Sequence, residues 1–87
     1  MRIAWDEPKR LSTLAHRGMD FATLDPEFFA GAVTTPARDG RYQAIGAFRG
    51  TLVTVIFTTL GSEAISVVSM RRASRKERNA HEAKDIG

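Results

Sequence analysis

"TLVTVIFTTLGSEAISVVSM", residues 51–70, decides the fold. Two runs rich in β-branched residues flank the turn signal Gly-Ser-Glu at 61–63, and this pattern predicts a β-hairpin. The segment "RYQAIGAF" at 41–48 predicts a further strand directly before the hairpin. "VTTPA" at 33–37 is an edge candidate because Pro36 cannot donate a hydrogen bond to a central ladder. We therefore expect an antiparallel sheet of three to four strands.

The first of two helices expected before the sheet has a start signal and a stop signal. Asp6 is a good N-cap, and Gly18 is well placed to end the helix in a left-handed turn. Between them, Leu11, Leu14 and Ala15 follow the i, i+3, i+4 spacing of an apolar stripe. We expect this stripe to face the core.

The second helical segment, Asp20 to Ala30, contains a break. Pro26 lacks an amide donor and clashes with the carbonyl four residues back, so we expect Asp25 to cap a separate short turn there. The apolar side chains expected to reach the core from this segment are Phe21, Leu24 and Phe28.

A capping box predicts the C-terminal helix. Ser74 and Glu77 have the S-x-x-E spacing, in which each side chain accepts a hydrogen bond from the backbone amide of the other residue. A helix from Arg75 to about Lys84 follows. This helix has little apolar surface, so we expect it to fray or to dock on a partner. With a short edge strand at Ile3 to Trp5, the fold class is α+β, with two N-terminal helices and one C-terminal helix.

Length and composition indicate one small globular domain, residues 1–87. The chain has no cysteine, which excludes disulfides and thiolate metal sites. Its acids and two histidines show no metal-ligand spacing, and we expect neither a metal nor another cofactor. The N-terminus becomes charged by the sixth residue, and no apolar run approaches the roughly 20 residues needed to span a bilayer, so we expect a cytoplasmic protein with no membrane partner.

Positive charge is concentrated in one place. The eight residues from Arg71 to Arg78 include five basic side chains and one acid, a net +4 in a chain whose formal charge is +3. Such a cluster attracts phosphate groups or an acidic partner, and a solvated basic surface is the alternative.

The basic cluster divides at Ser74. If the strand stays regular, Arg71 and Arg72 point to opposite faces of the sheet, and the sequence leaves open which one faces a site. Arg75 and Arg78 are neighbours on the following helix. The guanidinium fork donates two parallel hydrogen bonds, which suits phosphate. We therefore expect a phosphate site at the strand-to-helix junction, with Glu77 as the cap partner of Ser74.

Lys9 and His16 are the candidates for acid–base chemistry. They are seven residues apart on the first helix, hence within about 20° around its axis. A histidine titrates near neutrality, so the two side chains are an acid–base pair or merely a polar surface.

Three segments resemble the BrnT family of toxins from bacterial type II toxin–antitoxin systems: "WDEPKR" at 5–10, "HRGMDF" at 16–21 and "SVVSMRRASRKER" at 66–78. The S-x-R-R-A-x-x-x-E-R pattern of the last segment is the most specific part. The resemblance implies a RelE-like fold and a ribosome-independent, metal-independent endoribonuclease that inhibits translation. It also implies a cognate antitoxin with a ribbon-helix-helix domain, which inactivates the toxin, and it allows a toxin–antitoxin heterotetramer.

On this basis we expect the 2′-hydroxyl of the RNA substrate to attack the adjacent phosphorus. Arg71 or Arg72, helped by Arg75, would stabilise the developing charge, and Lys9 or His16 would assist proton transfer.

One departure from the family concerns the histidine. Many members read lysine-histidine-glycine where this chain reads His16-Arg17-Gly18, so the histidine is displaced by one position, about 100° around the helix. Two alternatives stay open: a non-catalytic basic module that docks an antitoxin or nucleic acid, and a degenerate toxin that no longer cleaves.

Overall fold

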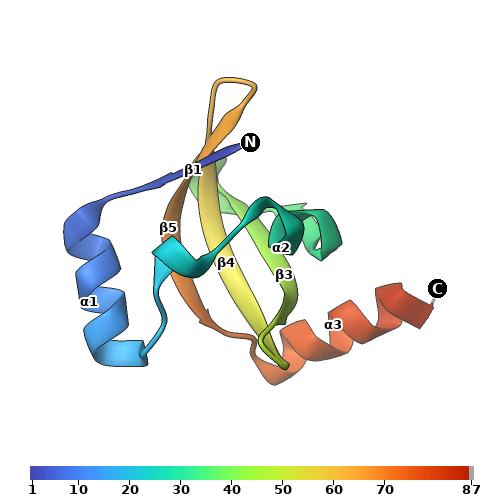
Figure 1. Cartoon of the computed structure of the whole chain (residues 1–87). Helices are drawn as coiled ribbons and strands as arrows, with labels where there is room; N and C mark the ends of the chain where they lie inside the picture. The colour runs from blue at the N-terminus through green and yellow to red at the C-terminus, as the bar shows by residue number, and fades with distance from the viewer. Residues whose placement is uncertain (87) are drawn as a thin grey trace.

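The computed structural model describes residues 1–86, with side chains described through residue 83. Its centre is a five-stranded sheet in the order β1-β5-β4-β3-β2 (Figure 1). The strands are β1 (Arg2–Trp5), β2 (Val33–Pro36), β3 (Tyr42–Phe48), β4 (Thr51–Leu60) and β5 (Ala64–Arg72). Neighbours from β2 to β5 are antiparallel, and β1 is parallel to β5.

The α+β class and the hairpin of β4 and β5 are confirmed, as is the edge position of β1 and β2. The prediction of an all-antiparallel sheet of three to four strands is wrong, because β1 adds a fifth, parallel strand. A tight turn makes consecutive strands antiparallel, whereas a long connection is compatible with either direction. Since two α-helices, two 3-10 turns and three strands separate β1 from β5, no local signal sets their relative direction.

The hydrophobic core lies on one face of the sheet, under a 3-10 turn, η1 (Phe21–Thr23), and helix α2 (Pro26–Gly31). Asp20 and Asp25 cap these two pieces through their carboxylates, which confirms the break before Pro26. The buried cluster consists of Phe21, Leu24, Phe28, Ala44, Val53, Val55, Phe57, Ile65, Val67 and Met70. The three core positions predicted in this segment are therefore confirmed.

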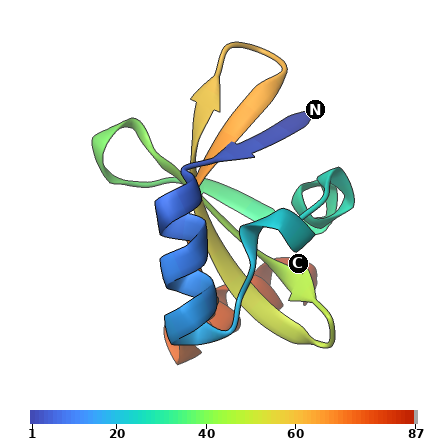
Figure 2. The same ribbon diagram turned by 60° about the vertical axis from the view of Figure 1, so that its left-hand side comes forward.

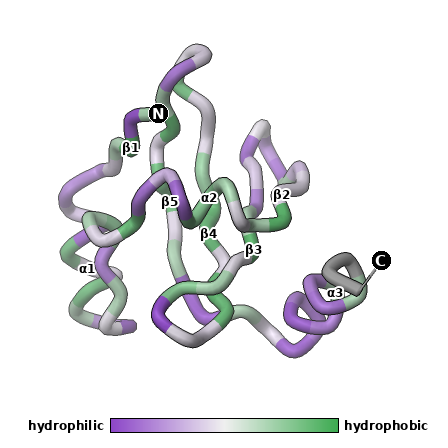
Figure 3. Tube along the Cα trace, turned by 45° about the vertical axis from the view of Figure 1, so that its right-hand side comes forward, coloured by the Kyte–Doolittle hydropathy of each residue, from purple (hydrophilic) through white to green (hydrophobic). Residues whose placement is uncertain are grey.

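Helix α3 (Arg75–Ile86) packs on the opposite face, which we call the second face (Figure 2). The capping box is confirmed: Glu77 N donates to Ser74 Oγ at 3.1 Å, and Ser74 N donates to Glu77 Oε1 at 2.8 Å. The helix continues to Ile86, slightly beyond its expected end. Figure 3 shows how hydrophilic most of its length is, so polar contacts have to hold it.

Helix α1 (Glu7–Arg17) begins and ends as predicted, with an Asp6 carboxylate accepting from Lys9 N and Gly18 in the left-handed region at φ 68°. The prediction that its apolar stripe faces the core is wrong. Leu11 is 52% exposed and Leu14 39% exposed, and no residue of α1 is buried. The helix instead turns its polar side to the sheet.

The reason for this orientation is an unpaired strand edge. β1 pairs with β5 only from Ala64 to Val67, which leaves the remainder of β5 without a neighbouring strand on that side. An open edge presents backbone groups that need partners. The Arg17 guanidinium supplies one, because its Nη1 donates to the carbonyl oxygen of Met70 at 3.0 Å. A polar helix face suits this edge better than leucines do.

A β-bulge sets the direction of the side chains at the end of β5. Phe57 pairs with Val67 and Ile56 pairs with Ser69, so Val68 is an extra residue. Because of this residue, Met70 joins Val67 in the core and Ser69 faces the other way. Arg71, two residues after Ser69, therefore lies on the second face.

Candidate functional site

A pocket of about 310 Å³ lies between α1 and the end of β5. Its lining residues are Lys9, Ser12, Thr13, His16 and Arg17 from α1, with Val68 and Ser69 from β5. The structure thus brings the two predicted acid–base candidates to one pocket. A larger hollow of about 860 Å³ beside the β4–β5 turn is lined by Met1, Arg2, Leu60, Ser62, Glu63 and Ala64. It lacks the basic cluster and the histidine, so we take the smaller pocket, hereafter the α1–β5 pocket, as the candidate site.

The position of His16 defines its tautomer. Its Nδ1 lies 2.8 Å from the carbonyl oxygen of Ser12, one turn earlier in the helix. A carbonyl oxygen only accepts, so Nδ1 carries the proton and donates it. In the neutral ring, Nε2 then holds the lone pair. His16 is consequently oriented to accept a proton through Nε2.

Arg17 is a site residue that sequence reasoning missed. Its Nη1 is shared between the Met70 carbonyl oxygen at 3.0 Å and the Ser69 hydroxyl at 3.4 Å. These contacts hold a permanent positive charge at the pocket. The signal was available in the spacing, because positions 9, 13, 16 and 17 fall on one side of an α-helix.

Arg71 lies on the second face in a fork-to-fork ion pair with Glu77. Its Nη1 is 2.6 Å from Oε1 and its Nη2 is 2.9 Å from Oε2. The same carboxylate accepts from Thr54 Oγ1 at 3.0 Å and from Ser74 N at 2.8 Å. These hydrogen bonds, above all those from Arg71, lower the pKa of Glu77 to about 2. Glu77 also raises the pKa of Arg71.

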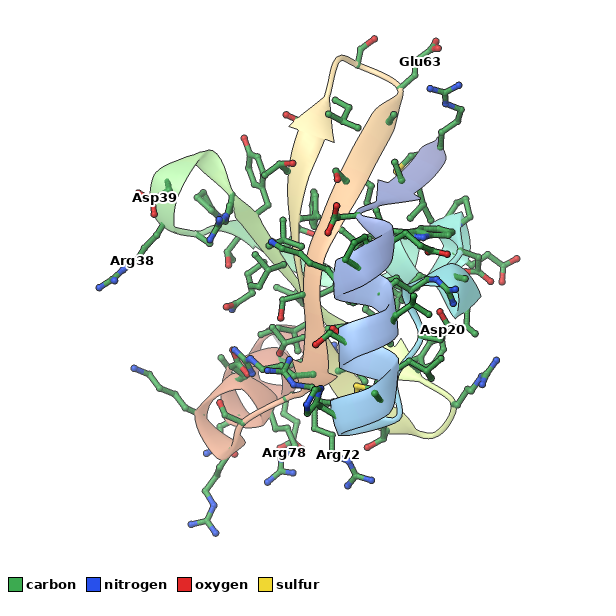
Figure 4. All side chains as sticks on the ribbon, turned by 90° about the vertical axis from the view of Figure 1, so that its left-hand side faces the viewer. Asp20, Arg38, Asp39, Glu63, Arg72 and Arg78 are labelled. Atoms are coloured by element: carbon green, nitrogen blue, oxygen red, sulfur yellow. The ribbon has the colours of Figure 1, made fainter. Side chains whose placement is uncertain are left out.

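The remaining basic residues of the cluster are exposed. Arg72, Arg75 and Arg78 lie at the end of the molecule where β5 passes into α3, and Figure 4 shows Arg72 and Arg78 extending outward there. The predicted site residues therefore form two groups, one in the α1–β5 pocket and one at the strand-to-helix junction. Ser69 and Arg71 connect the groups, since residues two apart on one strand face are about 7 Å from each other.

The described residues contain no cluster of metal ligands and no membrane-spanning helix. Among the described residues, no three His, Cys, Asp or Glu side chains gather in a way that could hold a metal ion. No helix within the described part of the chain is long and apolar enough to cross a bilayer.

Comparisons with known proteins agree with one another. Residues 5–77 match the family model described as ribonuclease toxin, BrnT, of type II toxin–antitoxin system. The chain is similar to the crystal structure, at 1.1 Å resolution, of the ribonuclease toxin BrnT from Brucella abortus. The two are 51% identical with a TM-score of 0.80, and the match covers 86% of this chain and 99% of the Brucella chain. A search of curated proteins found no match.

Proposed function

Since this chain belongs to the BrnT family of ribonuclease toxins of type II toxin–antitoxin systems, we propose that it cleaves RNA in the α1–β5 pocket without a metal ion. The observation that supports the site best is the hydrogen bond from His16 to Ser12, which keeps Nε2 of His16 available as a base. Lys9 and Arg17 line the same pocket and supply the positive charge that a phosphate needs.

The reaction is an internal displacement at phosphorus. His16 Nε2 removes the proton of a ribose 2′-hydroxyl, and the oxygen forms a bond to the adjacent phosphorus. The bond from phosphorus to the 5′-oxygen of the next nucleotide breaks, and that oxygen takes up a proton from Lys9 or water. The products carry a 2′,3′-cyclic phosphate and a 5′-hydroxyl. Arg17 and Lys9 stabilise the charge that develops on the phosphoryl oxygens.

The arginines of the strand-to-helix junction have a supporting role in this proposal. Arg72, Arg75 and Arg78 are exposed and bind flanking phosphates, which gives the complex its salt dependence. Arg71 is held by Glu77, so it contributes charge from a fixed position rather than a free guanidinium fork.

We also propose that the fold is RelE-like and that the loss of RNA through cleavage inhibits translation. The proposal also includes a cognate antitoxin of the ribbon-helix-helix class, bound in a toxin–antitoxin heterotetramer. The existence of a cognate antitoxin follows from membership of a type II toxin family.

The test is cleavage of end-labelled RNA by the purified, antitoxin-free chain in EDTA. We expect fragments with 2′,3′-cyclic phosphate ends, and His16→Gln should lower the rate by about 10² to 10⁴, the usual contribution of a general base. Arg38→Gln, in the turn between β2 and β3, is the control for loss of an exposed cation and should cleave like the wild type.

Two results would overturn the proposal. One is a requirement for added Mg²⁺, and the other is full activity in a variant that combines His16→Gln with Lys9→Gln. Intact RNA in a salt-sensitive complex would favour the binding module instead.

A further inference from the structure

Helix α1 presents its apolar side to solvent. Leu11, Leu14 and Ala15, which we call the α1 stripe, fall within an arc of about 100° around the helix. Ala15 is exposed, and Leu11 and Leu14 are two of the four large hydrophobic side chains that are exposed among the described residues. An apolar helix stripe normally packs against a core, and an exposed one marks an interaction site.

The α1 stripe is not needed to hold α1 in place. Arg10 joins the helix to Asp20 through Nη1, at 3.1 and 3.2 Å from the two carboxylate oxygens. Arg17 joins it to the edge of β5 at Met70. Both contacts lie on the polar side of the helix, so a partner can cover the α1 stripe without displacing either one.

We infer that the α1 stripe is the docking surface for the cognate antitoxin. The inference rests on the family membership and, for its inhibitory consequence, on the proposed function. An apolar helix face is recognised by a segment that lays apolar side chains along it at helical spacing. Since His16 lies only about 100° from Ala15 around the helix, a segment on the α1 stripe reaches the rim of the α1–β5 pocket.

The charge beside the α1 stripe indicates a second property of the partner. The rim of the α1–β5 pocket, on another side of helix α1, carries Lys9, His16 and Arg17. The complementary segment is therefore apolar on one side and acidic on the side that meets this rim. A second copy of this chain fits less well, because a two-fold contact through α1 brings identical basic rims toward each other. An acidic segment there would block access of RNA to the pocket.

The absence of cysteine from the sequence allows a direct test. Leu11→Cys puts a single thiol on the α1 stripe, and Leu60→Cys puts one on a leucine of similar exposure, 48%, at the β4–β5 turn. The probe is the product of the adjacent reading frame, once shown to co-purify with the wild-type chain. Maleimide labelling is followed by intact mass. We expect the antitoxin to abolish labelling at position 11 and to leave position 60 unchanged.

Growth assays with substituted chains separate docking from catalysis. Leu14→Arg should still arrest growth and should no longer be neutralised by the antitoxin, whereas Leu60→Arg should be neutralised normally. Leu11→Cys replaces an exposed side chain, so the labelling experiment decides the matter even if Leu14→Arg misfolds.

The inference is overturned if position 11 stays reactive in the assembled complex. It is also overturned if position 11 is already protected in the free chain and the mass is that of a dimer, which would identify a second copy as the occupant. Protection by the antitoxin in a chain that never cleaves RNA would support the docking surface and refute the proposed function, so the two failures are distinct.

Discussion

Arg71 and Glu77 form a two-pronged ion pair that fastens the end of β5 to the first turn of α3, with N–O distances of 2.6 and 2.9 Å. The Glu77 carboxylate also accepts from Thr54 on β4, the one buried polar residue among those described. One carboxylate therefore joins two strands to a helix whose described side chains bury little apolar surface.

Glu77→Gln should destabilise the fold by about 1–2 kcal/mol, since hydrogen bonds to charged groups contribute this much when water reaches one partner. Glutamine keeps an oxygen for Ser74 N and Thr54 Oγ1, which both donate to Oε1, so the loss reports on the ion pair with Arg71 and not on the cap. Urea unfolding measures the change. Glu82→Gln, on an exposed position of the same helix, is the matched control, and equal effects of the two substitutions would contradict the prediction.

Acid should weaken the folded state through the same carboxylate. The pKa of Glu77 is about 2 in the folded chain against an ordinary value of 4.5, so its contribution is complete above pH 4.5 and is lost as the pH falls toward 2. Hydrogen bonds from Arg10 lower the pKa of Glu7 as well, and those from Ala22 N and Arg10 lower the pKa of Asp20. Denaturant midpoints across this range measure the loss. The slope should be shallower in Glu77→Gln, and an unchanged slope would argue against this origin.

The orientation of α1 can be checked by one substitution made at two leucines. Leu11→Ala should change the free energy of unfolding by no more than about 0.5 kcal/mol, as at other exposed positions. Leu24→Ala should cost about 2–5 kcal/mol, because that side chain is only 6% exposed and leaves a cavity. Comparable losses at the two positions would mean that the α1 stripe packs against the protein after all.

Gly46 on β3 lies close to Phe28 of α2 and to Ala32, the residue that follows α2. An added Cβ would lie 3.0 Å from Ala32 Cβ and 3.2 Å from the Phe28 ring. Gly46→Ala should therefore cost about 1–3 kcal/mol through overpacking. Gly31→Ala adds the same methyl group where nothing lies within 4 Å, and it should be neutral or slightly stabilising. Thermal unfolding distinguishes the two, and a tolerated alanine at position 46 would refute the close approach.

The parts of the fold that sequence predicts are those set within a few residues. Asp6, Asp25 and the Ser74–Glu77 pair each satisfy amides three positions away, so the signal and its structural result lie in the same short segment. Phe21 and Phe28 are large and apolar, and burial is their usual environment.

The parts that sequence did not predict depend on contacts between distant segments. The direction in which the α1 stripe faces is decided by the unpaired edge of β5, some fifty residues away, and by Arg17 reaching Met70 across that separation. The bulge at Val68 does have a trace in the sequence, because the apolar residues Ile65, Val67 and Met70 do not follow the strict two-residue alternation of a regular strand. That trace settles the choice between the two adjacent arginines: Arg71, not Arg72, shares the face of Ser69.

The unpaired edge of β5 also bears on self-association of the chain. Exposed strand edges invite other chains to add a strand, which leads to aggregation. Arg17 already donates to the Met70 carbonyl, which an added strand would need as an acceptor. The guanidinium that lines the pocket therefore also protects the edge of the sheet. If Arg17 has the role proposed for it in cleavage, loss of that side chain would impair two unrelated properties together, solubility and cleavage.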